Sequence, residues 1–335
     1  MTEVEIGAGK RGHRAYAFDD IAVVPSRRTR DPHDVSVQWS IDAFTFASPI
    51  LSAPMDSVSS PATVIQMGKL GILGVLDLEG LWTRYEDPTP FYEEIKTLTD
   101  GNVTRRMQEI YSEPVKAELI TARLAEIRAA GVPVAGSLSP QRTQEFSQTV
   151  VDAGVDLFVI RGTTVSAEHV SLVGGASTYT SALHLMRTGA AGVLVGFGGG
   201  AASTTRAALG IHAPMATAVA DVAGARRDYM DESGGRYVHV IADGGLDTAG
   251  DIATEAPGGG FHWGAEAHHP ELPRGRRVEV GQIAPLENVL NGPTPSWDGR
   301  ANLVGALRRS MATTGYSDVK EFQRVEVVVA PYHRQ

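Results

Sequence analysis

Short apolar runs recur along the chain, and most are followed by a segment with the spacing of an amphipathic helix. Apolar runs of about four to eight residues predict buried strands, and the longer periodic segments predict the helices that cover them. We expect strands over residues 48–57 (running into a loop), 71–76, 131–136, 157–160, 172–175, 192–195 and 237–242, and helices over 61–70, 81–130, 142–153 and 181–189. This alternation predicts one α/β domain over residues 1–335, a (β/α)8 TIM barrel.

Some parts of the chain depart from the alternation. Residues 1–45 are predicted to form an irregular lead-in, and residues 302–322 a helical region that packs back on the barrel. Only twelve residues separate Ile160 from Val173, too few for a crossover helix with its loops. After Asp243 the sequence completes neither a helix nor an eighth strand. Because a seven-stranded barrel exposes two sheet edges, we interpret both gaps as segments missing from the printed sequence.

Composition narrows the class of protein. The 335 residues are 42% hydrophobic and 21% charged, as expected for a globular domain with a core. The sequence has neither an apolar run long enough to span a bilayer nor an apolar signal core near its start, which predicts a cytoplasmic protein without membrane contact. The net charge of −9 argues against a nucleic-acid partner. The absence of cysteine excludes disulfides, thiolate metal sites and a cysteine nucleophile.

A glycine-rich loop follows the predicted strand 192–195. It contains Gly196, Gly198, Gly199 and Gly200, and the hydroxyls of Ser203, Thr204 and Thr205 come shortly after. Glycine allows positive φ and brings backbone N–H groups close to a ligand, so a loop of this kind after a strand suits an anion such as a phosphate. The alternative is a flexible connector, since glycine-rich loops are common.

Two further features are candidates for binding. Asp243-Gly244-Gly245 closes the strand 237–242, where a fixed carboxylate suits a pair of sugar hydroxyls; the alternative is an ordinary turn, which Asp-Gly-Gly also favours. His268 and His269 lie in the loop 261–280, but no third ligand is spaced for a metal, so we expect none.

Five motifs taken together resemble the IMP dehydrogenase and GMP reductase family. They are FDDIAVVPS, SPILSAPMDSV, GVLVGFGGGAASTTR, VIADGGLDTAGDIA and NLVGALRRSMATTGYSDVKEF, in the family's order and over nearly the whole chain. The chain looks most similar to the shorter, IMP dehydrogenase-related branch, because only about fifty residues separate the second and third predicted strands. That is too few for the pair of CBS modules that longer members insert there.

The resemblance implies a chemistry and a set of site residues. Family members bind a purine 5′-monophosphate (IMP, XMP or GMP) and exchange hydride with NAD or NADP, in purine and GMP metabolism and usually as a homotetramer. Transferred to this sequence, the substrate residues are Ala53, Met55, Gly198, Gly199, Gly200, Ala201, Ser203, Thr204, Asp243, Gly244 and Gly245. The residues expected at the dinucleotide are Arg161, Gly162 and Gly175, and residues 261–280 occupy the place of the family's flap.

The departures from the family pattern matter as much as the matches. Ser203 stands where the family has the cysteine that attacks C2 of IMP, Arg161 where it has an aspartate, and Gly175 where it has an asparagine. A serine hydroxyl needs an adjacent base, and in sequence none lies beside Ser203, although His212 is a candidate to approach in space. We therefore expect little IMP dehydrogenase turnover.

Two functions of different classes remain open. The chain is either an NAD(P)-linked oxidoreductase on a purine nucleotide, or a degenerate relative that binds such a nucleotide as a sensor or assembly partner. A flavin-dependent barrel that uses the same phosphate loop is a third, weaker interpretation.

Overall fold

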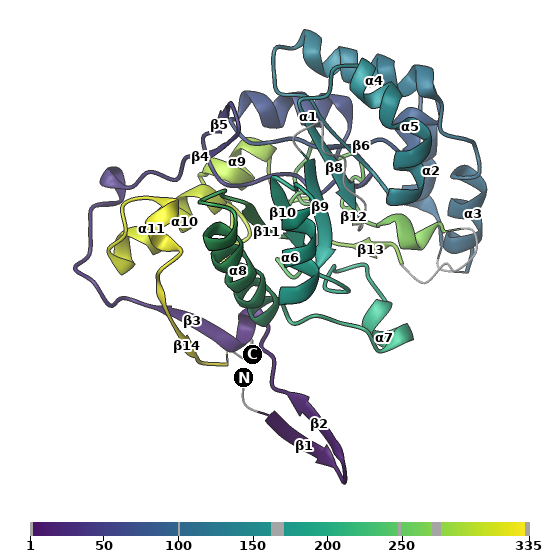
Figure 1. Cartoon of the computed structure of the whole chain (residues 1–335). Helices are drawn as coiled ribbons and strands as arrows, with labels where there is room; N and C mark the ends of the chain where they lie inside the picture. Colours follow the sequence, from purple (N-terminus) through teal and green to yellow (C-terminus); the bar gives the residue numbers. More distant parts are fainter. Residues whose placement is uncertain (1–2, 100, 162–170, 247–248, 270–275, 332–335) are drawn as a thin grey trace.

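Six parallel strands form the central sheet of the computed structural model, which describes residues 3–99, 101–161, 171–246, 249–269 and 276–331. The strand order is β11-β10-β9-β8-β7-β6, and all of these strands except β7 are labelled in Figure 1. Their bounds are β6 Leu76–Asp77, β7 Ala135–Leu138, β8 Leu157–Arg161, β9 Ser171–Ala176, β10 Gly192–Val195 and β11 His239–Ala242. A parallel bridge between Leu51 and Leu73 continues the sheet beyond β6.

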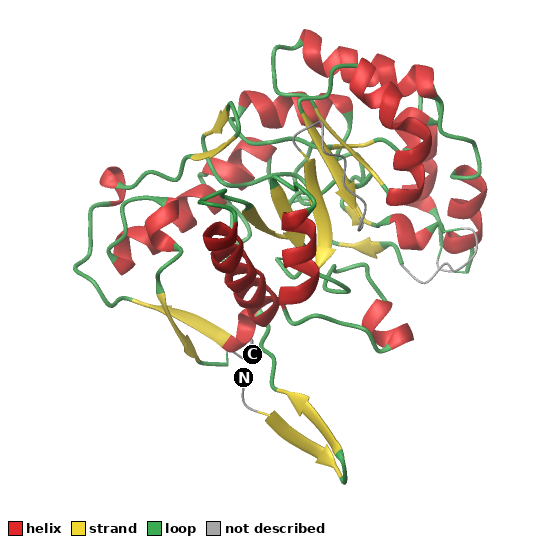
Figure 2. Cartoon of the chain, viewed as in Figure 1, coloured by secondary structure: helices red, strands yellow, loops and turns green. Residues whose placement is uncertain are grey.

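Helices connect the strands and cover the outer face of the sheet (Figure 2). They are α1 (Pro61–Lys69), α4 (Ala117–Ala129), α5 (Pro140–Asp152), α6 (Tyr179–Arg187) and α8 (Met215–Glu232). α6 packs against α8, and α4 packs against both α1 and α5. Ser60 shows why α1 begins where it does: its hydroxyl accepts the Thr63 N–H, and a proline follows at the first helical position.

The strands present different residues to the two faces of the sheet. Phe158 and Ile160 of β8 pack with the helices, whereas Leu157 and Val159 belong to an inner cluster with Leu194. Alternate burial on both faces is the arrangement of a barrel wall, with helices outside and packed side chains inside. The predicted TIM-barrel α/β fold is therefore confirmed.

The structure gives a different result for each of the two interruptions predicted from the sequence. β8 and β9 are direct neighbours, with Phe158 opposite Ser171, and their connection over residues 162–170 lies outside the described residues. In the described part of the chain the sheet has no eighth strand, so β11 lies at its edge.

The lead-in contains more regular structure than the sequence predicted. β1 (Glu3–Gly7) and β2 (Lys10–His13) form a hairpin that projects from the body (Figure 1), and β3 (Ile21–Val24) pairs antiparallel with β14 (Glu326–Val329). β4 (Trp39–Ile41) and β5 (Phe44–Phe46) form a second hairpin, which contributes Ile41 and Phe46 to the inner cluster. Local patterning missed the β3 pairing because its partner lies some three hundred positions away.

The remaining helices and turns lie outside the central sheet. They are α2 (Thr89–Thr97), α3 (Val103–Ile110), α7 (Thr205–Leu209), α9 (Leu286–Asn291), α10 (Leu303–Thr314), α11 (Val319–Phe322), and the 3-10 turns η1 (Phe18–Asp20), η2 (Pro32–Asp34), η3 (Leu81–Thr83) and η4 (Ala265–Ala267). β12 (Phe261–His262) pairs antiparallel with β13 (Val278–Glu279) in the segment expected to be flap-like. Among the described residues, no helix is long and apolar enough to cross a bilayer.

Candidate functional site

The turns that follow β10 and β11 lie against each other. The Asp243 N–H donates to the Val195 carbonyl at 2.8 Å, and the Gly245 N–H donates to the Gly199 carbonyl at 3.1 Å. Since β10 and β11 are parallel neighbours, both turns occupy the carboxyl edge of the sheet. The glycine-rich loop and Asp243 therefore lie on the same face of the barrel.

Close packing around the two turns requires glycine at two positions. A Cβ at Gly196 would lie 2.0 Å from the Asp243 carbonyl oxygen, and Gly196 has φ of 150°. Gly245 has φ of 71°, and a Cβ there would lie 2.9 Å from Cγ of Met215. A side chain at position 196 would push the two turns apart, and one at position 245 would press on Met215 at the start of α8, so glycine permits close packing at both positions.

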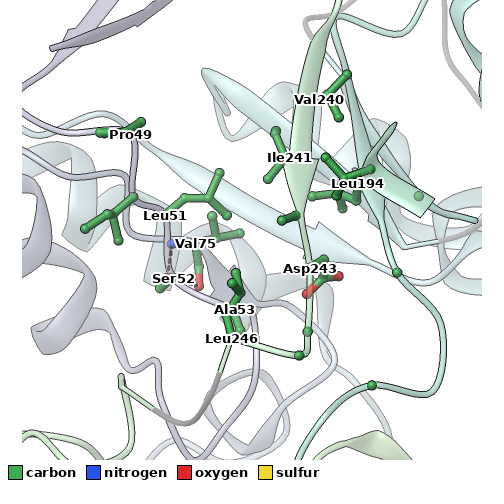
Figure 3. Close-up of a pocket in the computed structure, with 18 of the residues that line it drawn as sticks. Pro49, Leu51, Ser52, Ala53, Val75, Leu194, Val240, Ile241, Asp243 and Leu246 are labelled. Carbon is green, nitrogen blue, oxygen red and sulfur yellow. Dashed lines mark hydrogen bonds between the residues drawn. The ribbon is translucent and has the colours of Figure 1, made fainter. Parts of the chain in front are cut away.

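A large cavity opens at this edge of the sheet. Figure 3 shows Asp243 at the end of β11, below apolar side chains such as Leu51, Leu194 and Ile241. The expected site residues that line the cavity are Ala53, Met55, Arg161, Gly175, Gly198, Gly199, Gly200, Ala201, Ser203, Asp243, Gly244 and Gly245. Thr204 is not among the lining residues; it precedes α7, with its hydroxyl oxygen buried. Gly162 lies outside the described residues.

Asp243 is an exposed residue that lines the cavity. Neighbouring protein atoms displace part of the water around its carboxylate, which raises the pKa of Asp243 above its ordinary value, and the positive charge of Arg161 opposes the rise. A carboxylate in such a position gains more from donated hydrogen bonds than one in open solvent.

Arg161 has an acidic partner that the sequence analysis did not identify. Its Nη2 lies 3.3 Å from Oδ2 of Asp77, which follows Leu76 in the short strand β6. Burial raises the pKa of Asp77, and Arg161 lowers it. The guanidinium remains about a quarter exposed and faces the cavity, so it is available to an anionic ligand.

Steric contact explains why a glycine occupies position 175. A Cβ there would lie 2.4 Å from the carbonyl oxygen of Gly196. A side chain such as the family's asparagine therefore has no room unless the loop after β10 moves.

Ser203 has a carboxylate nearby after all. Its Oγ lies 3.4 Å from Oε2 of Glu266 and 3.0 Å from the Thr205 hydroxyl, which lies 2.9 Å from Oε1 of Glu266. Sequence reasoning missed Glu266 because it lies 63 positions from Ser203. His212, the base considered from sequence, is not among the residues that line the cavity.

Glu266 lies on a segment that is anchored by a buried polar network. The Trp263 indole N–H donates to the Tyr111 hydroxyl at 3.0 Å, and that hydroxyl donates to Oδ2 of Asp56 at 2.7 Å. Asp56 also accepts the Leu81 N–H at 2.8 Å. Burial, together with nearby Asp77, raises the pKa of Asp56 to about 7. This acid follows Met55 directly and was missed because Asp-Ser is an unremarkable loop sequence.

The paired histidines do not form a metal site within the described residues. The His268 ring stacks on Tyr111 with 3.5 Å between ring centroids, and burial followed by the charge of Arg84 lowers its pKa to about 3. No group of three or more His, Cys, Asp or Glu side chains in the described part of the chain is placed to hold a metal ion.

Comparison with known proteins identifies the family. The family model for the IMP dehydrogenase / GMP reductase domain matches residues 15–260. An uncharacterized oxidoreductase of Mycolicibacterium smegmatis and one of Mycobacterium tuberculosis are each 44% identical, over 97% of this chain and 99% of theirs. The crystal structure of an IMP dehydrogenase/GMP reductase-like protein from Corynebacterium glutamicum is similar with a TM-score of 0.91 and 42% identity, over 98% of both chains.

More distant relatives include the inosine-5′-monophosphate dehydrogenase of Cryptosporidium parvum, 24% identical over 71% of this chain. The mycobacterial alignments extend over 372 positions, whereas this chain has 335 residues, so those relatives contain residues opposite gaps in this sequence. The family model and the relatives together show that the chain belongs to the IMP dehydrogenase / GMP reductase family.

Proposed function

We propose that this protein is an NAD(P)-linked oxidoreductase that acts on a purine 5′-monophosphate in guanine nucleotide metabolism. The single observation that carries the proposal is the cavity at the carboxyl edge of the sheet, where Asp243 and the glycine-rich turn after β10 face the same space. Sites of TIM barrels lie at this edge.

The two turns supply complementary groups for a nucleotide. The Asp243 carboxylate accepts hydrogen bonds from the ribose hydroxyls, and the backbone N–H groups of the glycine-rich turns face the phosphate. Ala53 and Met55 line the same cavity and offer apolar contact to the base. The ligand is IMP, XMP or GMP.

The remaining part of the cavity fits a dinucleotide. Arg161 and Gly175 lie on β8 and β9, the next two strands of the sheet after β10, and the partly exposed Arg161 guanidinium matches an anionic group. When bound, NAD or NADP exchanges hydride with the purine ring. The residues present therefore fit the cofactor, with arginine contacting its charge where other family members use an aspartate.

A second candidate function rests on Ser203. With a hydroxyl in place of the family's thiol, the protein is alternatively a nucleotide-binding sensor or assembly partner without turnover. Nucleotide-dependent stabilisation that is never accompanied by NAD(P)H formation or consumption would select this alternative.

The test is a thermal-shift panel of purine 5′-monophosphates followed by turnover assays with NAD, NADP and their reduced forms. We expect at least one nucleotide to stabilise the parent protein. In Asp243→Ala we expect this stabilisation to be lost, because nucleotide binding weakens by roughly 1.5–3 kcal/mol. Asp231→Ala is the matched control, because Asp231 is an exposed residue of α8. A response in Asp243→Ala equal to that of the parent would reduce Asp243 to a turn residue.

A further inference from the structure

We propose that Glu266 is the base that serves the Ser203 hydroxyl, and that the buried Tyr111 hydroxyl is the positioning group that holds Glu266 in place. The inference rests on the proposed function for its substrate. It assigns roles to residues that the five sequence motifs do not contain.

The contacts around Ser203 form a short path for a proton. Thr205 is almost fully buried, and its hydroxyl lies within 3.2 Å of both Glu266 carboxylate oxygens and 3.0 Å from the Ser203 hydroxyl. The Ser203 hydroxyl also reaches Glu266 directly at 3.4 Å. All of these groups lie at the cavity, so the hydroxyl and its acceptor meet where the purine is proposed to bind.

Glu266 reaches this place because its segment docks on the residues between β6 and α4. Trp263 is 1% exposed and lies in a cluster with Ile95 and Met107 of α2 and α3. Tyr111 connects this cluster to the segment that carries Glu266. Its hydroxyl forms hydrogen bonds with both Asp56 and the Trp263 indole, and its ring stacks on His268. Glu266 lies between Trp263 and His268 in sequence, so both flanks of the glutamate are fixed by one tyrosine.

The step that these residues support is an addition without an oxidant. Ser203 Oγ forms a bond to the electrophilic ring carbon of the purine, and the electron pair of the carbon–nitrogen double bond moves to the ring nitrogen. The Ser203 proton passes to the Glu266 carboxylate, directly or through Thr205, so Glu266 becomes a neutral acid and the negative charge moves to the ring nitrogen. Near neutral pH a serine hydroxyl, unlike a thiol, needs an adjacent base before it can act as a nucleophile. The Glu266 carboxylate lies close enough to Ser203 to be that base.

The first test measures Ser203 reactivity without any cofactor. An alkyl fluorophosphonate forms an oxygen–phosphorus bond at an activated serine with loss of fluoride, and the modified residue is located by mass spectrometry. We expect labelling at Ser203 in the parent, at least a tenfold slower rate in Glu266→Gln, and the parental rate in Glu287→Gln, a matched exposed glutamate on α9. A parent that is not labelled at Ser203, or a Glu266→Gln variant labelled at the parental rate, would overturn the proposal.

Nucleotide titration by calorimetry separates this outcome from failure of the proposed function. Glu266→Gln is expected to bind a purine 5′-monophosphate within about twofold of the parent, because the base acts on Ser203 and not on the ligand's diol or phosphate. If neither protein binds nucleotide, the proposed function fails, while the labelling result still decides the role of Glu266.

The second test separates positioning from general stability. Tyr111→Phe keeps the stacked ring but removes the hydroxyl; Tyr179→Phe removes an exposed hydroxyl that bonds Asp228 on α8 and serves as control. We expect Tyr111→Phe to speed hydrogen exchange over residues 261–269 and to slow Ser203 labelling, with exchange in β8 and β10 unchanged. Parental exchange and labelling in Tyr111→Phe would overturn the positioning role, and so would exchange that rises equally throughout the barrel.

Discussion

Two regions meet over the cavity, and they are specified in different ways. The turns after β10 and β11 are short and glycine-rich, and each is recognisable from consecutive residues. Residues 261–269, which carry Glu266, are held by contacts such as Trp263 to Tyr111, whose partners are 152 positions apart. The conformation of the two turns therefore depends on backbone geometry, whereas the position of residues 261–269 depends on contacts between buried side chains.

The difference predicts how each region responds to substitution. The turns depend on the absence of side chains, so added atoms should damage them while removal of side chains elsewhere leaves them intact. The docked segment depends on large buried aromatic groups, so it should be sensitive to truncation and to the charge state of the acid beneath it.

The largest effect is expected from Trp263→Ala. Removing a fully buried tryptophan should lower the free energy of unfolding by about 3–5 kcal/mol, because a cavity remains within the cluster. Trp297 is 97% exposed, so Trp297→Ala should change it by less than about 0.5 kcal/mol. Urea unfolding of both variants provides the comparison, and similar midpoints for the two would mean that the segment is not docked as described.

Asp56, the buried acid that accepts a hydrogen bond from Tyr111, should make the free energy of unfolding depend on pH. Asp56 is protonated more readily in the folded state, since burial and Asp77 raise its pKa to about 7 despite the opposing contributions of Tyr111, Leu81 and Arg84. The folded protein therefore binds a proton that the unfolded chain releases near pH 4, and stability falls as pH rises from about 4 to about 7.

Asp56→Asn should remove this fall. Relative to the parent, the variant should gain free energy of unfolding on the order of 1 kcal/mol per pH unit across that interval and nothing further above it. Urea titrations at several pH values, with the exposed Asp231→Asn as control, would measure the difference. A constant offset between parent and Asp56→Asn at every pH would contradict the raised pKa.

A smaller effect is expected when an atom is added to the turns. Gly196→Ala places a Cβ against the Asp243 carbonyl oxygen and should cost about 1–3 kcal/mol, with loss of nucleotide-dependent stabilisation. Gly210→Ala is a useful control, since Gly210 also has a positive φ, of 68°, but nothing lies within 4 Å of the added Cβ. Equal loss of nucleotide response in the two variants would show that strain alone, and not separation of the turns, is responsible.

The sequence predicted the parts of this molecule that depend on local patterns. Apolar runs placed β8, β9 and β10 to within one or two residues, because a buried parallel strand is a short continuous run. The second predicted strand was less well placed, since Leu73 forms only an isolated bridge and β6 begins at Leu76.

The site residues, like the strands, were predicted where they belong to a local sequence pattern. Asp243 and the glycines were found from consecutive motifs, and the structure brings them together through backbone hydrogen bonds from Asp243 to Val195 and from Gly245 to Gly199. Glu266, Tyr111 and Asp77 were missed because only the folded chain places them, and a single Glu or Tyr in a polar stretch has no distinguishing signal. The roles expected of the site residues remain predictions.

The most direct measurement compares a ribonucleotide with its 2′-deoxy form in the parent and in Asp243→Ala. If the carboxylate holds the ribose hydroxyls, loss of the 2′-hydroxyl should weaken binding to the parent by roughly tenfold and to the variant by much less, a coupling energy of about 1 kcal/mol or more in the double-mutant cycle. Calorimetric titration of IMP and 2′-deoxy-IMP into both proteins gives the four dissociation constants. An equal ratio of the two constants in parent and variant would contradict the assignment of Asp243 to the ribose.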